Sequence, residues 1–247
     1  MTSQNNLSSF GSSRQYNTFS SRTGSLQIDR TIHELKVILL GDVAVGKTAV
    51  FNRFVDNTFI DEYVSNIGVA FKVKIIYLNE TTGAELKIWD TCGEEKFRSL
   101  TRQYYHDTHG AILMFDLTDK KTFLSTQTWY KDLRENGPRG TTIVLVGNKS
   151  DLVDNRAVTF EEAEAFAKSH HLQYLEVSAK TGDNIELVFD KLAYACVENA
   201  IRGSNQNDEL EVKSRTEKSG MMNNLGSSNN IPKKVLEKQK DKEVGCC

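Results

Sequence analysis

An eight-residue loop of sequence GDVAVGKT, residues 41–48, is the feature that most constrains what this chain can fold into. It matches the pattern G-x-x-x-x-G-K-[ST] and lies between an apolar run at residues 35–40 and a helical pattern at 48–55. Its glycines let backbone N–H groups approach phosphate oxygens, and the following helix points its positive end at them. The loop predicts a nucleotide phosphate site in which Lys47 reaches the terminal phosphates and Thr48 ligates Mg²⁺. The expected site residues are Gly41, Asp42, Val43, Ala44, Val45, Gly46, Lys47 and Thr48.

Between residues 34 and 202, short apolar runs alternate with amphipathic stretches. The runs predict strands at 35–40, 71–78, 85–89, 111–115, 143–146 and 174–177, and helical patterns lie at 48–55, 123–135, 160–169 and 185–199. Residues 71–78 partly alternate, which favours an antiparallel hairpin with the next run. Strands alternating with helices indicate an α/β domain with a mostly parallel sheet covered on both faces. In such a sheet, ligands bind beyond the carboxyl ends of the strands.

Two further motifs directly follow apolar runs. In the first, Asp90 is placed to support Mg²⁺, and Gly93 can bring a backbone N–H close to a terminal phosphate. In the second, NKSD, the carboxylate of Asp151 can accept from both N1–H and the exocyclic amine of guanine, a pair of donors that adenine lacks. Asn148 and the stem of Lys149 are expected to frame the base.

A last motif, Ser178, Ala179 and Lys180, offers backbone N–H groups to the guanine O6. Each of the four motifs follows a predicted strand, so all four can face one edge of the sheet. Their joint placement predicts a guanine-nucleotide site.

The two ends of the chain differ from this middle part. Residues 1–33 are rich in Ser, Asn, Thr and Gln and are expected to form a disordered arm, while 203–247 read as a flexible tail. A net charge of -2 over 247 residues gives no reason to expect nucleic-acid binding, which normally shows as a basic patch or stripe. No apolar run approaches the roughly 18 residues of a membrane span, and the polar N-terminus is unlike a secretory signal.

Four cysteines, Cys92, Cys196, Cys246 and Cys247, show neither metal-ligand spacing nor a disulfide pattern, which fits a reducing compartment. The last two end the chain on a flexible tail, which suits dual lipidation, because two lipid chains anchor stably where one binds marginally. The alternative is a pair of free or disulfide-linked thiols.

In these four motifs the chain resembles a small GTPase of the Ras superfamily, and within it a Rab, over about residues 34–200. The Rab-like detail is IGVAFK (67–72), WDTCGEEKFRSLTRQYY (89–105) and the ending GCC. The resemblance implies a P-loop small GTPase domain with a six-stranded mostly parallel sheet. It also implies GTP/GDP and Mg²⁺ as ligands, and a switch in vesicular membrane traffic that hydrolyses GTP.

The same resemblance implies further residues and partners. Phe59 would lie against the guanine ring, and effectors would bind Tyr63, Val64, Ser65, Asn66, Ile67, Gly68, Val69, Ala70, Phe71, Trp89 and Tyr104. Cys246 and Cys247 would receive geranylgeranyl groups. Implied partners are an exchange factor, a GTPase-activating protein, effectors and a prenyl-binding chaperone. The chain is expected to be a monomer at the cytoplasmic face of an intracellular membrane, with a cytosolic pool.

Three residues near the terminal phosphate depart from the family pattern. Asn66 replaces a Thr that ligates Mg²⁺, although its carbonyl can also ligate. Glu94 replaces a Gln that orients the attacking water, and a carboxylate cannot donate to the phosphoryl group. Val43 replaces a small residue and can crowd that water. We therefore expect near-normal nucleotide binding with slow hydrolysis, for which Glu94 and Lys47 are the candidate catalytic residues.

Three alternatives stay open at this point. One is a Rab-like scaffold that remains GTP-bound and recruits effectors without useful turnover. Another is a P-loop nucleotide kinase, against which the NKSD and SAK motifs argue because they select a base and not a phosphoacceptor. The third is the Ras or Rho branch, which the terminal cysteines and the absence of an inserted helical pattern near residues 153–159 disfavour.

Overall fold

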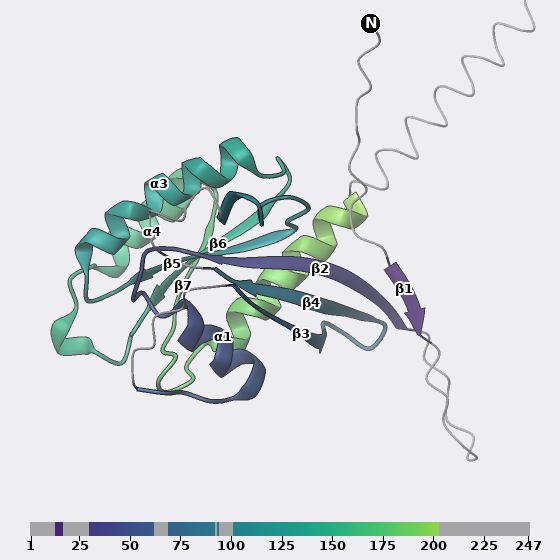
Figure 1. Ribbon diagram of the computed structural model, residues 1–247, viewed down its shortest axis with the longest axis horizontal. Helices are drawn as coiled ribbons and strands as arrows, with labels where there is room; N and C mark the ends of the chain where they lie inside the picture. The colour runs from purple at the N-terminus through teal and green to yellow at the C-terminus, as the bar shows by residue number, and fades with distance from the viewer. Residues whose placement is uncertain (1–12, 17–29, 62–68, 92, 94–100, 203–247) are drawn as a thin grey trace, which may run out of the picture. The chain divides into compact units, whose positions relative to one another are not determined.

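The computed structural model describes residues 13–16, 30–61, 69–91, 93 and 101–202. The strands are β1 (Ser13–Tyr16), β2 (Arg30–Leu40), β3 (Ala70–Tyr77), β4 (Thr82–Asp90), β5 (Gly110–Asp116), β6 (Thr142–Asn148) and β7 (Gln173–Glu176) (Figure 1). The helices that the structure describes are α1 (Lys47–Asp56), α3 (Lys120–Asn136), α4 (Phe160–Ser169) and a C-terminal helix over 185–202. The short segment η2 (Val153–Asn155) is a 3-10 turn. Every predicted strand and helix of the domain is therefore present.

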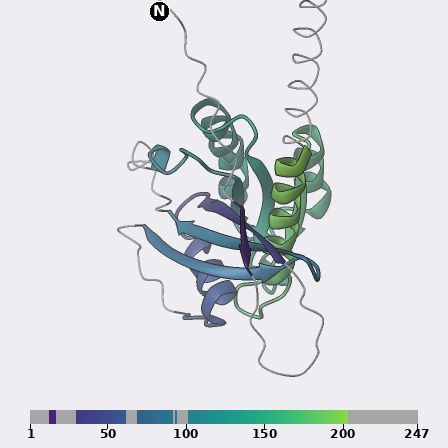
Figure 2. The ribbon, with the colours of Figure 1, turned by 90° about the vertical axis from the view of Figure 1, so that its right-hand side faces the viewer.

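Six strands form the body of the sheet in the order β3-β4-β2-β5-β6-β7. β3 pairs antiparallel with β4, whereas the β2–β4, β2–β5, β5–β6 and β6–β7 pairings are all parallel. This confirms the predicted mostly parallel α/β sheet. Figure 2, turned by 90°, shows helices on both sides of it.

A seventh strand, β1, pairs antiparallel with the first four residues of β2, so that Ser13 lies opposite His33 and Tyr16 opposite Arg30. Residues 1–33 were expected to be a disordered arm, and residues 13–16 and 30–33 instead form strands. For residues 30–33 of β2, burial and backbone preference explain why they form a strand. Ile32 is 4% exposed, and the β-branched Thr31 and Ile32 favour extended backbone along the parallel partner β4.

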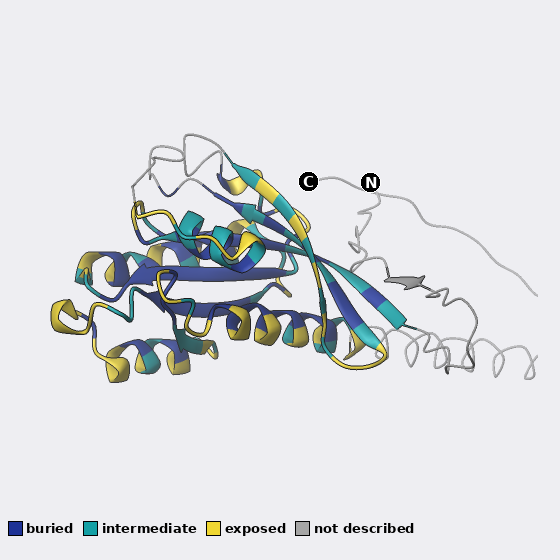
Figure 3. Cartoon of the chain, turned by 90° about the horizontal axis from the view of Figure 1, so that it is seen from below, coloured by how far each residue is buried: buried dark blue, intermediate teal, exposed yellow. Residues whose placement is uncertain are grey.

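The core has two halves, one on each face of the sheet. Successive side chains of a strand point to opposite faces. In β2, Val37 and Leu39 accordingly belong to a cluster with residues of α1 and the C-terminal helix, and Ile38 and Leu40 to one with residues of α3 and α4. Figure 3 shows the central strands buried and the outer faces of the helices exposed. The end of β2, from which the GDVAVGKT loop departs, is thus fixed from both sides.

The chain divides into two units, Met1–Gly203 and Ser204–Cys247, and all described residues lie in the first. The expected tail at 203–247, with Cys246 and Cys247, lies outside the described residues, as does Cys92. Over the part of the chain that the structure describes, no helix combines the length and apolar character needed to cross a bilayer.

Candidate nucleotide site

The GDVAVGKT loop, residues 41–48 or the phosphate loop, turns tightly against the sheet between the end of β2 and the start of α1. Gly41 has φ 142°, and a Cβ placed on it would lie 2.2 Å from the carbonyl oxygen of Met114 in β5. Only glycine allows this approach, because any side chain would clash with the neighbouring strand. The turn brings the loop over the carboxyl end of the sheet, where the other motifs also lie.

Lys47 lies inside this loop and is 6% exposed. Its Nζ donates to the carbonyl oxygens of Gly41, at 2.9 Å, and Asp42, at 2.7 Å, so the loop curls around the ammonium group. A Cβ on Gly93 would lie 2.3 Å from that Nζ and 2.5 Å from the Asp42 carbonyl oxygen. The backbone at Gly93 therefore lies directly against the ammonium group of Lys47.

Thr48 and Asp90 meet at the same place. The Thr48 hydroxyl donates to Asp90 Oδ2 at 2.7 Å, and Asp90, the last residue of β4, is fully buried. A hydroxyl and a carboxylate side by side are oxygen ligands of the kind that Mg²⁺ takes, usually together with substrate phosphates. With the Lys47 ammonium nearby, the residues present fit a nucleotide phosphate group and its Mg²⁺.

On the base side, the amide of Asn148 joins three motifs. It is 1% exposed, its Nδ2 donates to Val45 O at 2.9 Å, and its Oδ1 accepts from Ala179 N at 3.2 Å. The Asp151 carboxylate accepts from the Ser178 hydroxyl at 2.6 Å, which sets its orientation. The NKSD and SAK motifs are thus fixed to each other and to the phosphate loop.

Two contacts at this side were not expected from sequence. Lys149, which has φ 68°, places its Nζ 2.5 Å from Oδ2 of Asp116 at the end of β5. Arg53 of α1 donates from Nε to Ala179 O and from Nη2 to Lys180 O, both at 2.8 Å. No short motif marks Asp116 or Arg53, because each partner is distant in the chain.

Phe59, which the family resemblance places beside the guanine ring, lies near the same loop. The Arg53 guanidinium carbon is 5.9 Å from the centre of its ring, and Phe59 is partly buried against the core. Arg53 therefore connects Phe59 to the carbonyls of the SAK motif.

The aromatic residues of the expected effector surface do group together. The rings of Phe71 and Trp89 are 4.7 Å apart, those of Trp89 and Tyr104 are 5.3 Å apart, and Phe71 is 46% exposed. Val69 and Ala70 are also described. The expected effector residues Tyr63, Val64, Ser65, Asn66, Ile67 and Gly68, and the candidate catalytic residue Glu94, lie outside the described residues. Val43 is 44% exposed on the phosphate loop.

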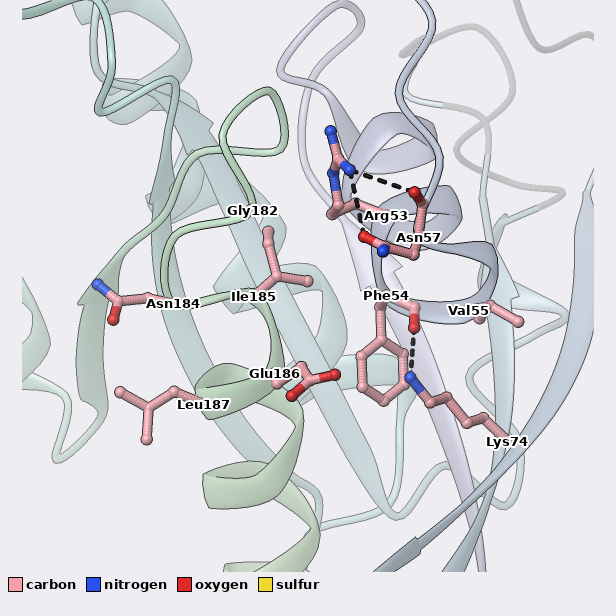
Figure 4. A pocket seen from close by; sticks show the side chains of 10 residues that line it. All are labelled: Arg53, Phe54, Val55, Asn57, Lys74, Gly182, Asn184, Ile185, Glu186 and Leu187. Carbon is pink, nitrogen blue, oxygen red and sulfur yellow. Dashed lines mark hydrogen bonds between the residues drawn. The ribbon is translucent and has the colours of Figure 1, made fainter.

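A pocket of ≈ 500 Å³ opens beside residues 182–184, which follow the SAK motif, between α1, β3 and the start of the C-terminal helix (Figure 4). Arg53 and Asn57 lie on one wall, Lys74 donates to the carbonyl oxygen of Phe54 on another, and Glu186 lies opposite. None of the residues predicted to bind nucleotide lines this pocket, so it is separate from the site described above.

Known proteins resemble this chain over the same region. The Ras family pattern matches residues 36–198. The Ras-related protein Rab-1 of Theileria annulata is 42% identical over 161 residues, which make up 65% of this chain and 73% of that protein. RabC of Dictyostelium discoideum is 43% identical over 159 residues, 64% of this chain and 81% of that protein. Rab-13 of Rattus norvegicus is 39% identical over 161 residues, 65% and 79% of the two chains. With its mostly parallel sheet and four loops gathered at one edge, the chain belongs to the Ras family of small GTPases, and within it is related to the Rab proteins.

Proposed function

We propose that this chain is a Rab-type GTP/GDP switch in vesicular membrane traffic that binds guanine nucleotide with Mg²⁺ and hydrolyses GTP slowly. The observation that carries the proposal is the chain of hydrogen bonds from Val45 through Asn148 to Ala179, beside the pairs Thr48–Asp90 and Ser178–Asp151. These bonds join a phosphate-binding loop to a carboxylate that can select guanine. The kinship with Rab proteins supports a role in membrane traffic.

In this proposal the nucleotide is held at both ends. Lys47 and the loop N–H groups bind the terminal phosphates, Asp151 accepts from guanine, and the backbone of 178–180 contacts the base. Thr48, Asn66 and Asp90 hold Mg²⁺, which neutralises charge on the phosphates when bound. Ordering of the loops around Tyr63–Phe71 and Asp90–Glu95 by the terminal phosphate then creates the effector surface with Trp89 and Tyr104.

Hydrolysis is the step that the substitutions near the terminal phosphate alter. Glu94 accepts from the attacking water but cannot donate to the phosphoryl group, and it adds negative charge there. Val43 is a branched, 44% exposed side chain on the phosphate loop and crowds the space for that water. Lys47 still stabilises charge, so binding is retained while turnover is slow.

The test is single-turnover hydrolysis of GTP by the full chain with Mg²⁺, after chromatography of the bound nucleotide. We expect Glu94→Gln to raise the rate by about tenfold or more, since it restores a donor to the phosphoryl group. Val43→Gly, made separately, is expected to raise it by a smaller factor. Equal rates for the wild-type chain and both variants would contradict the proposed cause of slow turnover.

A second candidate function is a GTP-bound scaffold that recruits effectors with little or no hydrolysis. Three altered residues at one reaction centre, Val43, Asn66 and Glu94, favour it, because the binding residues are unaltered. Bound GTP without measurable turnover, in the wild-type chain and in Glu94→Gln alike, is the result expected of a scaffold.

Membrane attachment is part of the proposal. Cys246 and Cys247 are proposed to carry geranylgeranyl groups, because two lipid chains give stable anchoring. The protein then works at the cytoplasmic face of an intracellular membrane, with a cytosolic pool held by a prenyl-binding chaperone, and responds to an exchange factor and a GTPase-activating protein.

A further inference from the structure

Trp129, on α3, forms a hydrogen bond to Asp42 of the phosphate loop. Trp129 Nε1 donates to Asp42 Oδ1 at 2.7 Å, and Trp129 is 1% exposed. The two residues are 87 positions apart, so the bond joins separate elements. A hydrogen bond to a carboxylate is stronger than one between neutral groups, and burial strengthens it further.

Asp42 connects Trp129 to Lys47. Its side chain accepts from Trp129, and its carbonyl oxygen accepts from Lys47 Nζ at 2.7 Å. A Cβ on Gly93 would lie 2.5 Å from the same carbonyl oxygen. A shift of Asp42 would therefore move both the phosphate-binding lysine and the backbone at Gly93.

The helix that carries Trp129 is itself firmly held. Trp129 and Leu133 belong to the core cluster on one face of the sheet. One turn along, Asp132 accepts from Arg102 Nε at 2.9 Å and from the Tyr105 hydroxyl at 3.0 Å. α3 is thus fixed to the sheet and to the chain at 102–105, and it offers Asp42 a rigid support.

We infer that Trp129 is a positioning residue for nucleotide binding, acting through Asp42 to hold the phosphate loop and Lys47 in the geometry that the β- and γ-phosphates require. This rests on the proposed function, since it concerns the affinity of that site for guanine nucleotide. The influence of Trp129 passes through the carboxylate of Asp42, to which its Nε1 donates.

The test uses the full chain with Trp129→Phe, which keeps an aromatic ring in the core but removes the N–H donor. We expect GDP to dissociate about tenfold faster, equivalent to about 1.4 kcal/mol. Affinity for GMP, which lacks the outer phosphate, is expected to fall much less. A general loosening of the fold would instead weaken GDP and GMP by the same factor.

The partner residue gives a second measurement. Asp42→Ala is expected to match Trp129→Phe, and the double variant to add nothing to either, because both remove one interaction. Additive effects would show that the two residues act independently and would overturn the inference.

A spectroscopic signature complements the kinetics. The chain has 2 Trp residues, so the indole N–H region of a ¹H–¹⁵N spectrum holds two signals, and Trp129→Phe assigns them. The Trp129 signal is expected to move in Asp42→Ala, whereas the Trp89 signal is expected to stay. An unchanged Trp129 signal in that variant would contradict the bond.

Thr141→Val is the matched control. Its buried hydroxyl lies 2.8 Å from Pro138 O and 3.0 Å from Thr108 O, just before β6 begins and so at the opposite end of the sheet from the site. Loss of this hydroxyl is expected to lower stability while GDP dissociation stays at the wild-type rate. Faster release in this control too would overturn the inference. If the wild-type chain binds no guanine nucleotide, the proposed function fails, and the nuclear magnetic resonance test still decides whether the bond exists.

Discussion

The side-chain amide of Asn148 hydrogen-bonds to two loops, the phosphate loop and the SAK motif. Its Nδ2 and Oδ1 groups bond partners that are 103 and 31 positions away in the chain, at 1% exposure. A buried amide with both its N–H and C=O groups hydrogen-bonded contributes to the stability of the fold. A buried amide without partners destabilises the fold by more than a made hydrogen bond stabilises it. The residue therefore fixes the distance between the phosphate loop and the SAK motif, in addition to the framing of the base expected from sequence.

Asp151 is predicted to decide which base is bound. Replacing it by Asn removes the charge that accepts two guanine hydrogen bonds, so GTP affinity should fall about tenfold to hundredfold. The preference for GTP over ATP should shrink with it. Displacement of fluorescent GDP by each nucleotide measures both effects.

Asp154→Asn is the matched control for that experiment. Asp154 is an exposed acid in η2, three residues along the chain, and it belongs to none of the nucleotide motifs. Equal affinity losses in the two variants would contradict the role given to Asp151.

His109 is predicted to make stability depend on pH. Burial lowers the pKa of His109, with Lys36 and Lys87 lowering it further and Asp107 opposing them, and the Lys36 N–H donates to its Nδ1 at 3.0 Å. The folded state thus resists protonation more than the unfolded state does. Stability should be constant above the ordinary histidine pKa of about 6.5 and fall as pH drops below it.

Urea unfolding at pH 7.5 and pH 5.5 measures this dependence, and His109→Gln should reduce it to the part that comes from His33, whose pKa burial also lowers. The exposed His171, replaced by Asn because its φ is 55°, serves as the control and should leave the wild-type dependence in place. A flattening in the control variant as large as in His109→Gln would count against the prediction.

At the scale of elements, α3 shows how a helix can be anchored by polar groups. Its Asp132 is 5% exposed and accepts from Arg102 and Tyr105, and Asn136 Nδ2 donates to the Asp132 carbonyl oxygen at 2.8 Å. The hydrogen bond of Asp132 raises the pKa of the Arg102 guanidinium. The helix is held at this end by directed bonds as well as by apolar contact.

Tyr105→Phe should lower the free energy of unfolding by about 1 kcal/mol, because it removes a buried hydroxyl bond while keeping the ring. Thermal or urea unfolding measures the change. As a control on α3, Glu135→Gln breaks an exposed ion pair with Lys131 and should leave stability nearly unchanged. A loss in Glu135→Gln as large as in Tyr105→Phe would contradict the argument.

The elements of the domain could be predicted because their patterns are local. The all-buried β5 reads as an apolar run, and the alternating β3 reads as a half-exposed strand. The four loops could be placed at one edge because parallel strands share a carboxyl end. β1 could not be predicted, since its pairing with β2 joins a short polar segment to residues 14 to 20 positions away.

The contacts that tune the site were not predictable for a similar reason. Arg53 is 126 positions from Ala179, and Trp129 is 87 from Asp42. Such bonds depend on how helices cross the sheet, and sequence patterns do not encode that geometry. For Trp129 the residue type alone indicates that some hydrogen-bond acceptor is present, because a buried indole N–H usually finds one, but it does not identify Asp42.

At the scale of the whole molecule, β1 protects the part of β2 that extends beyond β5. The pairing of β2 with β5 begins at Val37, so on that edge residues 30–33 have β1 as their partner. An uncovered strand edge invites pairing with other chains. The strand therefore belongs to the architecture of the sheet, at the end remote from the phosphate loop.

Deleting residues 1–16 should expose that edge. Amide hydrogen exchange at residues 30–33 should speed up, because the backbone loses its partner strand, while GDP affinity should stay within about twofold. Exchange in β6, which β1 does not contact, serves as the internal reference. Unchanged exchange at 30–33 would show that β1 does not protect them in solution.

The bonds of Asn148 also set an order of events during synthesis. The amide needs Val45, made early, and Ala179, made after about seven tenths of the 247 residues. β2 likewise waits for β4 and β5, whose paired residues lie 51 and 73 positions later in the chain, and such distant pairings form slowly. A nascent chain on the ribosome thus carries a finished GDVAVGKT sequence long before it has a place for guanine. A chain truncated before residue 179 would lack one partner of Asn148 and the core residues of the C-terminal helix, and its exposed apolar surface would make it prone to aggregate.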